Sequence, residues 1–132
     1  MNALDRFGPL AGRCLLGLLF IVSGIGKITG YSATAGYMAG HGLPFVGLLL
    51  PLTILVELGG GLMLVFGWHA RWAALVLFLF LIPTTLIFHN FWAVPVEQMQ
   101  GQKINFLKNL AIMGGMLCIV AFGAGRYSID RE

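Results

Sequence analysis

Four long apolar stretches dominate this chain of 132 residues, and they limit its possible folds more than any other feature. They cover residues 10–28, 45–66, 72–88 and 104–122, and none shows the alternation of apolar and polar residues that marks a membrane-spanning strand. Each is close to the ~20 residues that an α-helix needs to cross ~30 Å of hydrocarbon. The sequence therefore predicts an all-α membrane protein, in which residues 1–132 form a single four-helix transmembrane bundle.

Composition supports this prediction and excludes several functions. Charged residues make up 10% of the chain, against about 25% in a soluble domain. The net charge of +3 is spread along the whole chain, so we expect no nucleic-acid interface. Cys14 and Cys118 are far apart and form no CxxC motif, which argues against a disulfide scaffold or thioredoxin-like chemistry. The three histidines lack the spacing of metal ligands, so we expect no metal site.

The basic residues also predict an orientation in the membrane. With four spans, one side of the bilayer receives five arginines: Arg6, Arg13, Arg71, Arg126 and Arg131. Because cytoplasmic loops carry an excess of arginine and lysine, both termini are expected in the cytoplasm. Trp68 and Trp72 would then mark the inner interface and Trp92 the outer one. Residues 29–44, with room for one short helical turn, and residues 89–103 would form outer loops.

Besides Arg13, near the inner end of the first span, three charged residues fall inside the predicted spans: Lys27, Glu57 and Lys108. Such residues are costly in lipid and normally face a partner or a cavity. Side chains lean toward the N-terminus of their own helix, so Lys27 and Glu57 on antiparallel helices lean toward each other. Glu57 is therefore expected to be the counter-charge of Lys27 and, less directly, of Lys108. A purely structural pair that fixes helix packing is the alternative interpretation.

Other residues complete this predicted polar region. Ser23 and Thr53 lie one turn from Lys27 and Glu57 on the same helix faces. Gly60 and Gly61 lie about one turn beyond Glu57 and should let a neighbouring helix approach closely. Asn109 follows Lys108 directly and points about 100° away from it, so the two are not expected to face one point.

Five segments in order resemble the DoxX family of small bacterial membrane proteins. They are LLFIVSGIGKITGY (18–31), LVELGGGLMLVFG (55–67), FHNFW (88–92), NFLKNLAIMGGML (105–117) and GAGRYSIDR (123–131). The resemblance implies a four-helix bundle in the bacterial inner membrane and an association with quinone or redox chemistry. The candidate functional residues that it implies by motif position are Lys27, Glu57, His89, Trp92, Lys108 and Asn109.

Two functions follow as hypotheses. The first is a quinone site in the outer half of the bundle, where Lys27, Glu57 and His89 would serve catalysis or proton transfer. The residues that would hold the quinone are Lys27, Lys108, Trp92 and Asn109. The sequence shows no motif for an electron carrier of its own, so this hypothesis includes a redox partner subunit or a homo-oligomer. The second is a non-enzymatic accessory, assembly or scaffold subunit of a membrane complex, in which the charges specify packing.

The orientation is the first testable prediction. A reporter enzyme that works only in the cytoplasm, fused after Glu132, should be active, because the arginines hold that side of the bundle inside. The matched fusion to a reporter that works only in the periplasm should be inactive. The opposite pattern of activity would overturn the predicted orientation.

Overall fold

The computed structural model describes residues 2–131, and within that range it contains helices and no strand. The elements in chain order are α1 (Ala3–Thr29), α2 (Tyr31–Gly40), α3 (Val46–Phe66), α4 (Ala70–Phe88), the short 3₁₀ helix η1 (Phe91–Ala93) and α5 (Val96–Phe122). Four of them, α1, α3, α4 and α5, are long and apolar enough to cross a membrane. The predicted four-helix membrane bundle is confirmed.

The helices extend beyond the apolar stretches at several ends. α1 begins at Ala3 instead of residue 10, because Asn2 accepts a hydrogen bond from the Asp5 N–H (2.8 Å) and caps it. α5 begins at Val96 instead of residue 104, so much of the predicted loop 89–103 is helical. Residues 29–44 contain the ten-residue α2 instead of a single turn. Hydropathy marks where a chain meets lipid, whereas a helix continues into polar residues until its backbone is capped.

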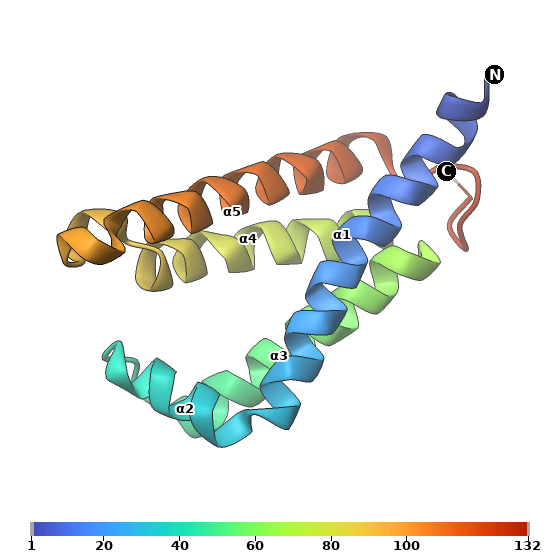
Figure 1. Ribbon diagram of the computed structural model, residues 1–132. Helices are drawn as coiled ribbons and strands as arrows, with labels where there is room; N and C mark the ends of the chain where they lie inside the picture. The colour runs from blue at the N-terminus through green and yellow to red at the C-terminus, as the bar shows by residue number, and fades with distance from the viewer. Residues whose placement is uncertain (1, 132) are drawn as a thin grey trace.

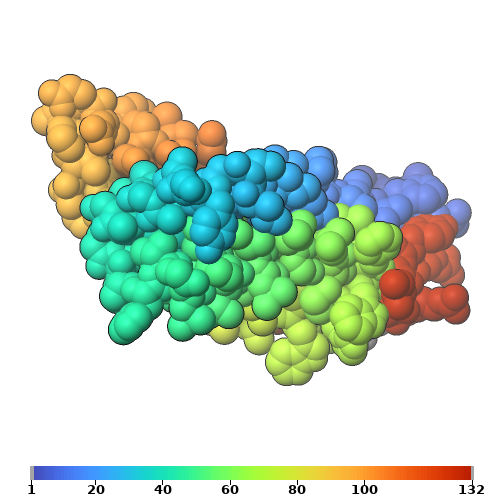
Figure 2. All heavy atoms as spheres, turned by 90° about the horizontal axis from the view of Figure 1, so that it is seen from below, coloured from blue at the N-terminus to red at the C-terminus, as the bar shows by residue number. Residues whose placement is uncertain are grey.

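The four long helices form two antiparallel pairs, α1 with α3 and α4 with α5 (Figure 1). The pairs meet at the end of the molecule that carries both termini and diverge toward the end that carries α2. In the space-filling view from below, η1 and the first turns of α5 project beyond α2 at this second end (Figure 2). The molecule therefore has one closed end and one open end.

Glycine allows the closest helix contact, between α1 and α3. A Cβ atom at Gly17 would lie 2.7 Å from the Gly61 carbonyl oxygen, and one at Gly61 would lie 2.8 Å from the Gly17 carbonyl oxygen. Gly60 faces α4 instead, where a Cβ atom would lie 3.0 Å from Leu77 Cγ. The expectation that Gly60 and Gly61 admit a close neighbour is confirmed, and each glycine admits a different helix.

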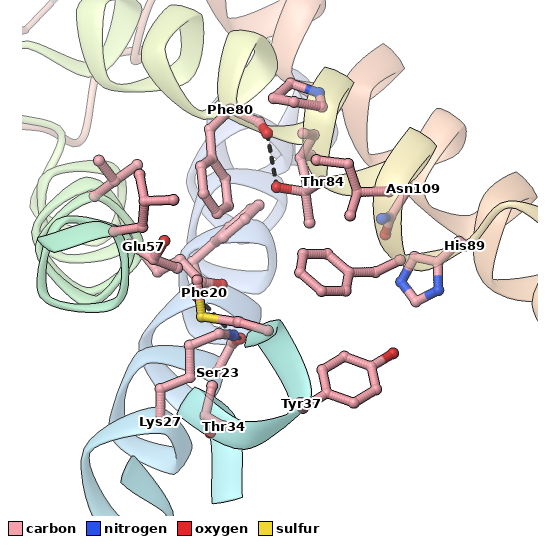
Figure 3. A pocket seen from close by; sticks show the side chains of 18 of the residues that line it. Phe20, Ser23, Lys27, Thr34, Tyr37, Glu57, Phe80, Thr84, His89 and Asn109 are labelled. Atoms are coloured by element: carbon pink, nitrogen blue, oxygen red, sulfur yellow. Dashed lines mark hydrogen bonds and ion pairs between the residues drawn. The ribbon is translucent and has the colours of Figure 1, made fainter. Parts of the chain in front are cut away.

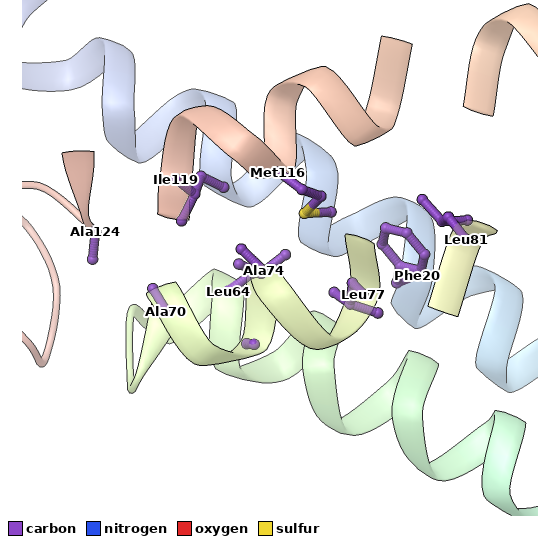
Figure 4. Close-up of a cluster of buried hydrophobic side chains, with 10 residues drawn as sticks. Phe20, Leu64, Ala70, Ala74, Leu77, Leu81, Met116, Ile119 and Ala124 are labelled. Atoms are coloured by element: carbon purple, nitrogen blue, oxygen red, sulfur yellow. The ribbon is translucent and has the colours of Figure 1, made fainter. Parts of the chain in front are cut away.

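The hydrophobic core lies where the two pairs meet (Figure 4). Small side chains of α4, Ala70, Ala73 and Ala74, are almost fully buried there and let the other helices approach. Leu77 and Met116 fill the space between the pairs and have no exposed surface. Most other large apolar side chains are exposed, as expected for a protein whose solvent is lipid.

Arg13 holds the closed end together. It is 2% exposed, and its guanidinium donates hydrogen bonds to four backbone carbonyls, those of Leu64, Val65, Ala124 and Tyr127. Two of these carbonyls, those of Leu64 and Val65, belong to the last turn of α3, where helix carbonyls have few backbone partners; Leu64 also accepts from the Gly67 N–H at 3.2 Å. The other two belong to the segment after α5. Arg13 thus lies at the same end as Arg71 and Arg126, as predicted, but its guanidinium is buried within the fold and does not face water.

The C-terminal segment folds back over this closed end. The carboxylate of Asp130 accepts hydrogen bonds from the backbone N–H groups of His69 (2.8 Å) and Ala70 (2.9 Å), at the start of α4. A carboxylate stabilises a helix at this position, because the first N–H groups lack partners and the helix dipole is positive there. Phe7 of α1 stacks on Tyr127 with ring centroids 5.3 Å apart.

The tryptophans and cysteines are placed as follows. Trp68 and Trp72 are exposed beside the short α3–α4 connection at the closed end, and Trp92 is exposed in η1. Cys14 and Cys118 are both free thiols.

Replacing Arg13 with methionine should destabilise the protein strongly. The change leaves several buried carbonyls without a donor, and each unsatisfied buried group costs about 1–3 kcal/mol. The melting temperature in detergent should therefore fall clearly. The matched control is Arg6→Met on the same helix, where the side chain is exposed. Equal melting temperatures for the two variants would contradict this role of Arg13.

Candidate functional site

A cavity of about 590 Å³ lies between the two helix pairs where they diverge (Figure 3). Its volume is within the range of ~300–1,000 Å³ that is typical of small-molecule sites. Apolar side chains such as Phe20, Leu52 and Phe80 make up most of its lining. About half of the Leu52 side chain is exposed, so the cavity reaches the surface of the bundle.

Polar groups enter this apolar cavity from every helix around it. From α1 and α3 they are Ser23, Lys27, Thr53 and Glu57, and from α2 they are Thr34 and Tyr37. Thr84 comes from α4, and His89 is the residue that follows α4. Asn105, Lys108 and Asn109 come from α5. Figure 3 shows Lys27, Ser23 and Glu57 together on one side, with His89 and Asn109 on the other. A ligand in the cavity would thus meet polar groups on two opposite walls.

Lys27 and Glu57 form an ion pair, as predicted. Lys27 Nζ lies 2.7 Å from Glu57 Oε1 and also donates a hydrogen bond to Ser23 Oγ at 2.8 Å. The Glu57 side chain is 6% exposed and that of Lys27 is 27% exposed. The pair forms because α1 and α3 are antiparallel, so the two side chains lean toward one another along the contact. The expected interaction between Ser23 and Lys27 is also confirmed.

The Glu57 carboxylate nevertheless retains unused capacity as an acceptor. The contact with Lys27 is an ion pair by distance, but it does not have the angles of a hydrogen bond, and nothing else in residues 2–131 donates to Oε1. A buried oxygen without a donor is rare, because leaving it unsatisfied costs free energy. Here the oxygen belongs to a side chain that lines a cavity, where a ligand can supply the donor.

The opposite wall has different hydrogen bonding. His89 Nδ1 lies 2.9 Å from Gln102 Oε1, and Asn109 Nδ2 donates to Thr85 Oγ1 at 3.0 Å. Lys108 is exposed and lines the cavity, and within the described range no ion pair or hydrogen bond of its ammonium is found. The less direct pairing of Lys108 with Glu57 that the sequence predicted is therefore not found in residues 2–131.

Two expectations about the candidate residues need correction. Lys108 and Asn109 line the same cavity, although their directions on the helix differ by about 100°. The cavity is wide enough for two neighbouring positions of α5 to border it. Trp92 lies outside the lining; it packs edge-on against Phe91 and Phe106, with centroids 5.2 Å and 5.8 Å away. The structure thus brings together five of the six candidates.

Helix α2 contributes residues that the sequence did not reveal. Tyr37 stacks on Phe88 of α4 with centroids 5.3 Å apart, and His41 packs against the same ring at 4.9 Å. Met38 is buried and lines the cavity with Thr34. α2 therefore links the α1–α3 pair to α4 across the open end. A signal was present, since Tyr37 and His41 are spaced i, i+4, but the segment was interpreted as a loop.

Comparisons with known proteins identify close relatives. The DoxX family profile matches residues 8–90, which include Lys27, Glu57 and His89. Inner membrane protein YqjF of Escherichia coli (strain K12) is 44% identical over 131 residues, covering 99% of this chain and 95% of YqjF. Inner membrane protein YphA of the same strain is 30% identical over 123 residues, covering 93% of this chain and 88% of YphA. No solved structure matches the chain significantly.

Substitutions of the ion pair separate a structural role from a functional one. Glu57→Gln removes the counter-charge of a partly buried lysine, and breaking a buried pair in this way costs about 3 kcal/mol or more. The variant should melt at a lower temperature in detergent. The double variant Lys27→Met/Glu57→Met should recover thermal stability, because it leaves no unpaired charge.

Function in the double variant then decides between the two roles. A stable double variant with normal function would indicate a packing role, whereas a stable but inactive one would indicate that the charges serve a ligand or a proton. Wild-type stability and function in Glu57→Gln would contradict both roles.

Proposed function

The chain belongs to the DoxX family and is a multi-pass inner membrane protein, and on this basis we propose that it is a redox-associated subunit that binds a quinone between its two helix pairs. The observation that carries the proposal is the buried Lys27–Glu57 pair, which faces an otherwise apolar cavity. Ionisable groups within a membrane are expensive and commonly mark a ligand or proton site.

The shape and lining of the cavity suit an amphiphile with a small polar ring. Leu19, Leu49 and Leu52 line one side of the cavity and are apolar along their whole length. Leu19 and Leu52 are about half exposed, so an isoprenoid tail has an apolar route from the ring toward the lipid. A ring and its tail together bring far more apolar than polar surface, which matches this lining.

The polar groups can hold the ring from both walls. Lys108 has three N–H donors without a partner in the described range, and it can donate to a ring oxygen. Asn109 lies beside it and is oriented by its hydrogen bond to Thr85. A bound quinone would supply two-electron, two-proton redox chemistry. Glu57 and His89 are the groups able to hold a proton beside it, and a partner subunit would supply the electrons.

The orientation in the membrane belongs to the same proposal. An even number of spans places both termini on one side, and the structure has both at the closed end. With the arginine-rich termini in the cytoplasm, the cavity lies in the outer half of the bilayer. Quinones are dissolved in the membrane, so the site receives its ligand from lipid and not from water.

Ligand binding tests this proposal directly. Purified protein in nanodiscs, titrated with a short-tailed benzoquinone, should bind it. Lys108→Met should weaken binding about tenfold or more, which corresponds to the loss of one hydrogen bond to a charged group. Lys103→Met is the control, because Lys103 is also exposed on α5 but does not line the cavity. Absence of binding in the wild type, or equal losses in both variants, would overturn the proposal.

Co-purification provides a second measurement. Protein extracted from membranes should carry endogenous quinone in an amount comparable to the protein. Recovery of stable partner subunits without quinone would favour the accessory or assembly role instead.

A further inference from the structure

The hydrogen-bonding groups on the α1–α3 wall are unequally used. The Lys27 ammonium has three N–H donors, of which one goes to Ser23, and its nitrogen lies 2.7 Å from Glu57 Oε1. The ionised Glu57 carboxylate has about four acceptor positions, and its Oε1, although 2.7 Å from Lys27 Nζ, is buried without a hydrogen bond of good geometry. The Glu57 carboxylate on this wall therefore keeps acceptor capacity beside the cavity.

Two of the hydroxyl groups that line the cavity donate elsewhere and not to Glu57. Thr34 donates its hydroxyl to the Gly30 carbonyl at 2.9 Å, and Thr84 donates to the Phe80 carbonyl at 2.9 Å. Both hydroxyls are thus occupied within their own helices, although both residues line the cavity. A ligand in the cavity can supply a donor to Glu57 Oε1.

From this acceptor capacity, and resting on the proposed function, we infer that the cavity binds the dihydroxy form of its ligand, the hydroquinone, in preference to the quinone. A hydroquinone hydroxyl donates to the Glu57 carboxylate in a charge-assisted hydrogen bond. A quinone carbonyl has only lone pairs, and next to Glu57 it places acceptor against acceptor. A site that hydrogen-bonds a hydroxyl discriminates strongly against an analogue that lacks it.

The opposite wall does not oppose this preference. Lys108 can donate to a hydroquinone oxygen as well as to a quinone carbonyl, because both carry lone pairs. Asn109 has one N–H engaged with Thr85 and is held in place in either case. The discrimination between the two forms therefore comes from Glu57.

Three ligands with the same ring and tail test the inference in the wild-type protein. They are a short-tailed benzoquinone, its hydroquinone kept reduced under anaerobic conditions, and the dimethyl ether of that hydroquinone. The hydroquinone should bind about tenfold or more tightly than either of the others, because it alone can donate to the carboxylate. The ether separates hydrogen-bond donation from ring shape, and this comparison requires no variant to fold.

Variants then assign the preference to one residue. In Glu57→Gln the preference for the hydroquinone should fall to within about twofold, because the amide offers a donor to the quinone as well as an acceptor to the hydroquinone. Glu97→Gln is the matched control: it makes the same chemical change at an exposed carboxylate on α5, outside the cavity, and should retain the full preference.

The outcomes distinguish the two proposals. Equal binding of quinone and hydroquinone, tight binding of the ether, or an unchanged preference in Glu57→Gln would each overturn the inference while leaving a quinone site in place. If none of the three ligands binds, the proposed function itself fails and the inference fails with it.

Discussion

The contact between Gly17 and Gly61 determines how the rest of this molecule is arranged. In lipid, apolar side chains gain nothing by leaving the solvent, so helices associate through close packing. Glycine on both sides brings the backbones of α1 and α3 together, and a Cβ atom at either position would clash with the partner's carbonyl oxygen. This contact fixes the register of the antiparallel pair. In one direction along the pair Arg13 reaches the end of α3, and in the other Lys27 reaches Glu57.

Because the bundle lies in lipid, the charges that hold the fold can be told apart from those that could serve a ligand. At the closed end, Arg13 donates to four carbonyls and Asp130 accepts from two N–H groups, so these charges are fully engaged in holding the fold. At the cavity, Glu57 Oε1 lacks a hydrogen bond, and no partner for Lys108 is found between residues 2 and 131. Both residues line one cavity. This buried oxygen and this exposed ammonium on one cavity are the observations on which the proposed ligand site rests.

The ion pair could be predicted from sequence because it depends on local rules. Helix direction follows from the order of the spans, and the lean of each side chain follows from helix geometry, so Lys27 and Glu57 were expected to meet. Arg13 could not be interpreted in this way. Its partners include Ala124 and Tyr127, which come close only because the C-terminal segment turns back, with positive φ at Gly123 and Gly125. The sequence around Arg13 gives no indication that the C-terminal segment turns back toward it.

The cavity itself depends on a quantity that no local pattern encodes, the divergence of the two helix pairs. That divergence explains why Lys108 and Asn109 border one space, and why α2 has room to lie across the open end. The core and the Arg13 hydrogen bonds join the pairs at the closed end, whereas the stacking of Tyr37 on Phe88 links them at the open end. Side chains thus link the pairs at both ends, and the cavity lies between these links. The Lys27–Glu57 pair on its wall is positioned by the same close packing of α1 against α3 that stabilises the bundle.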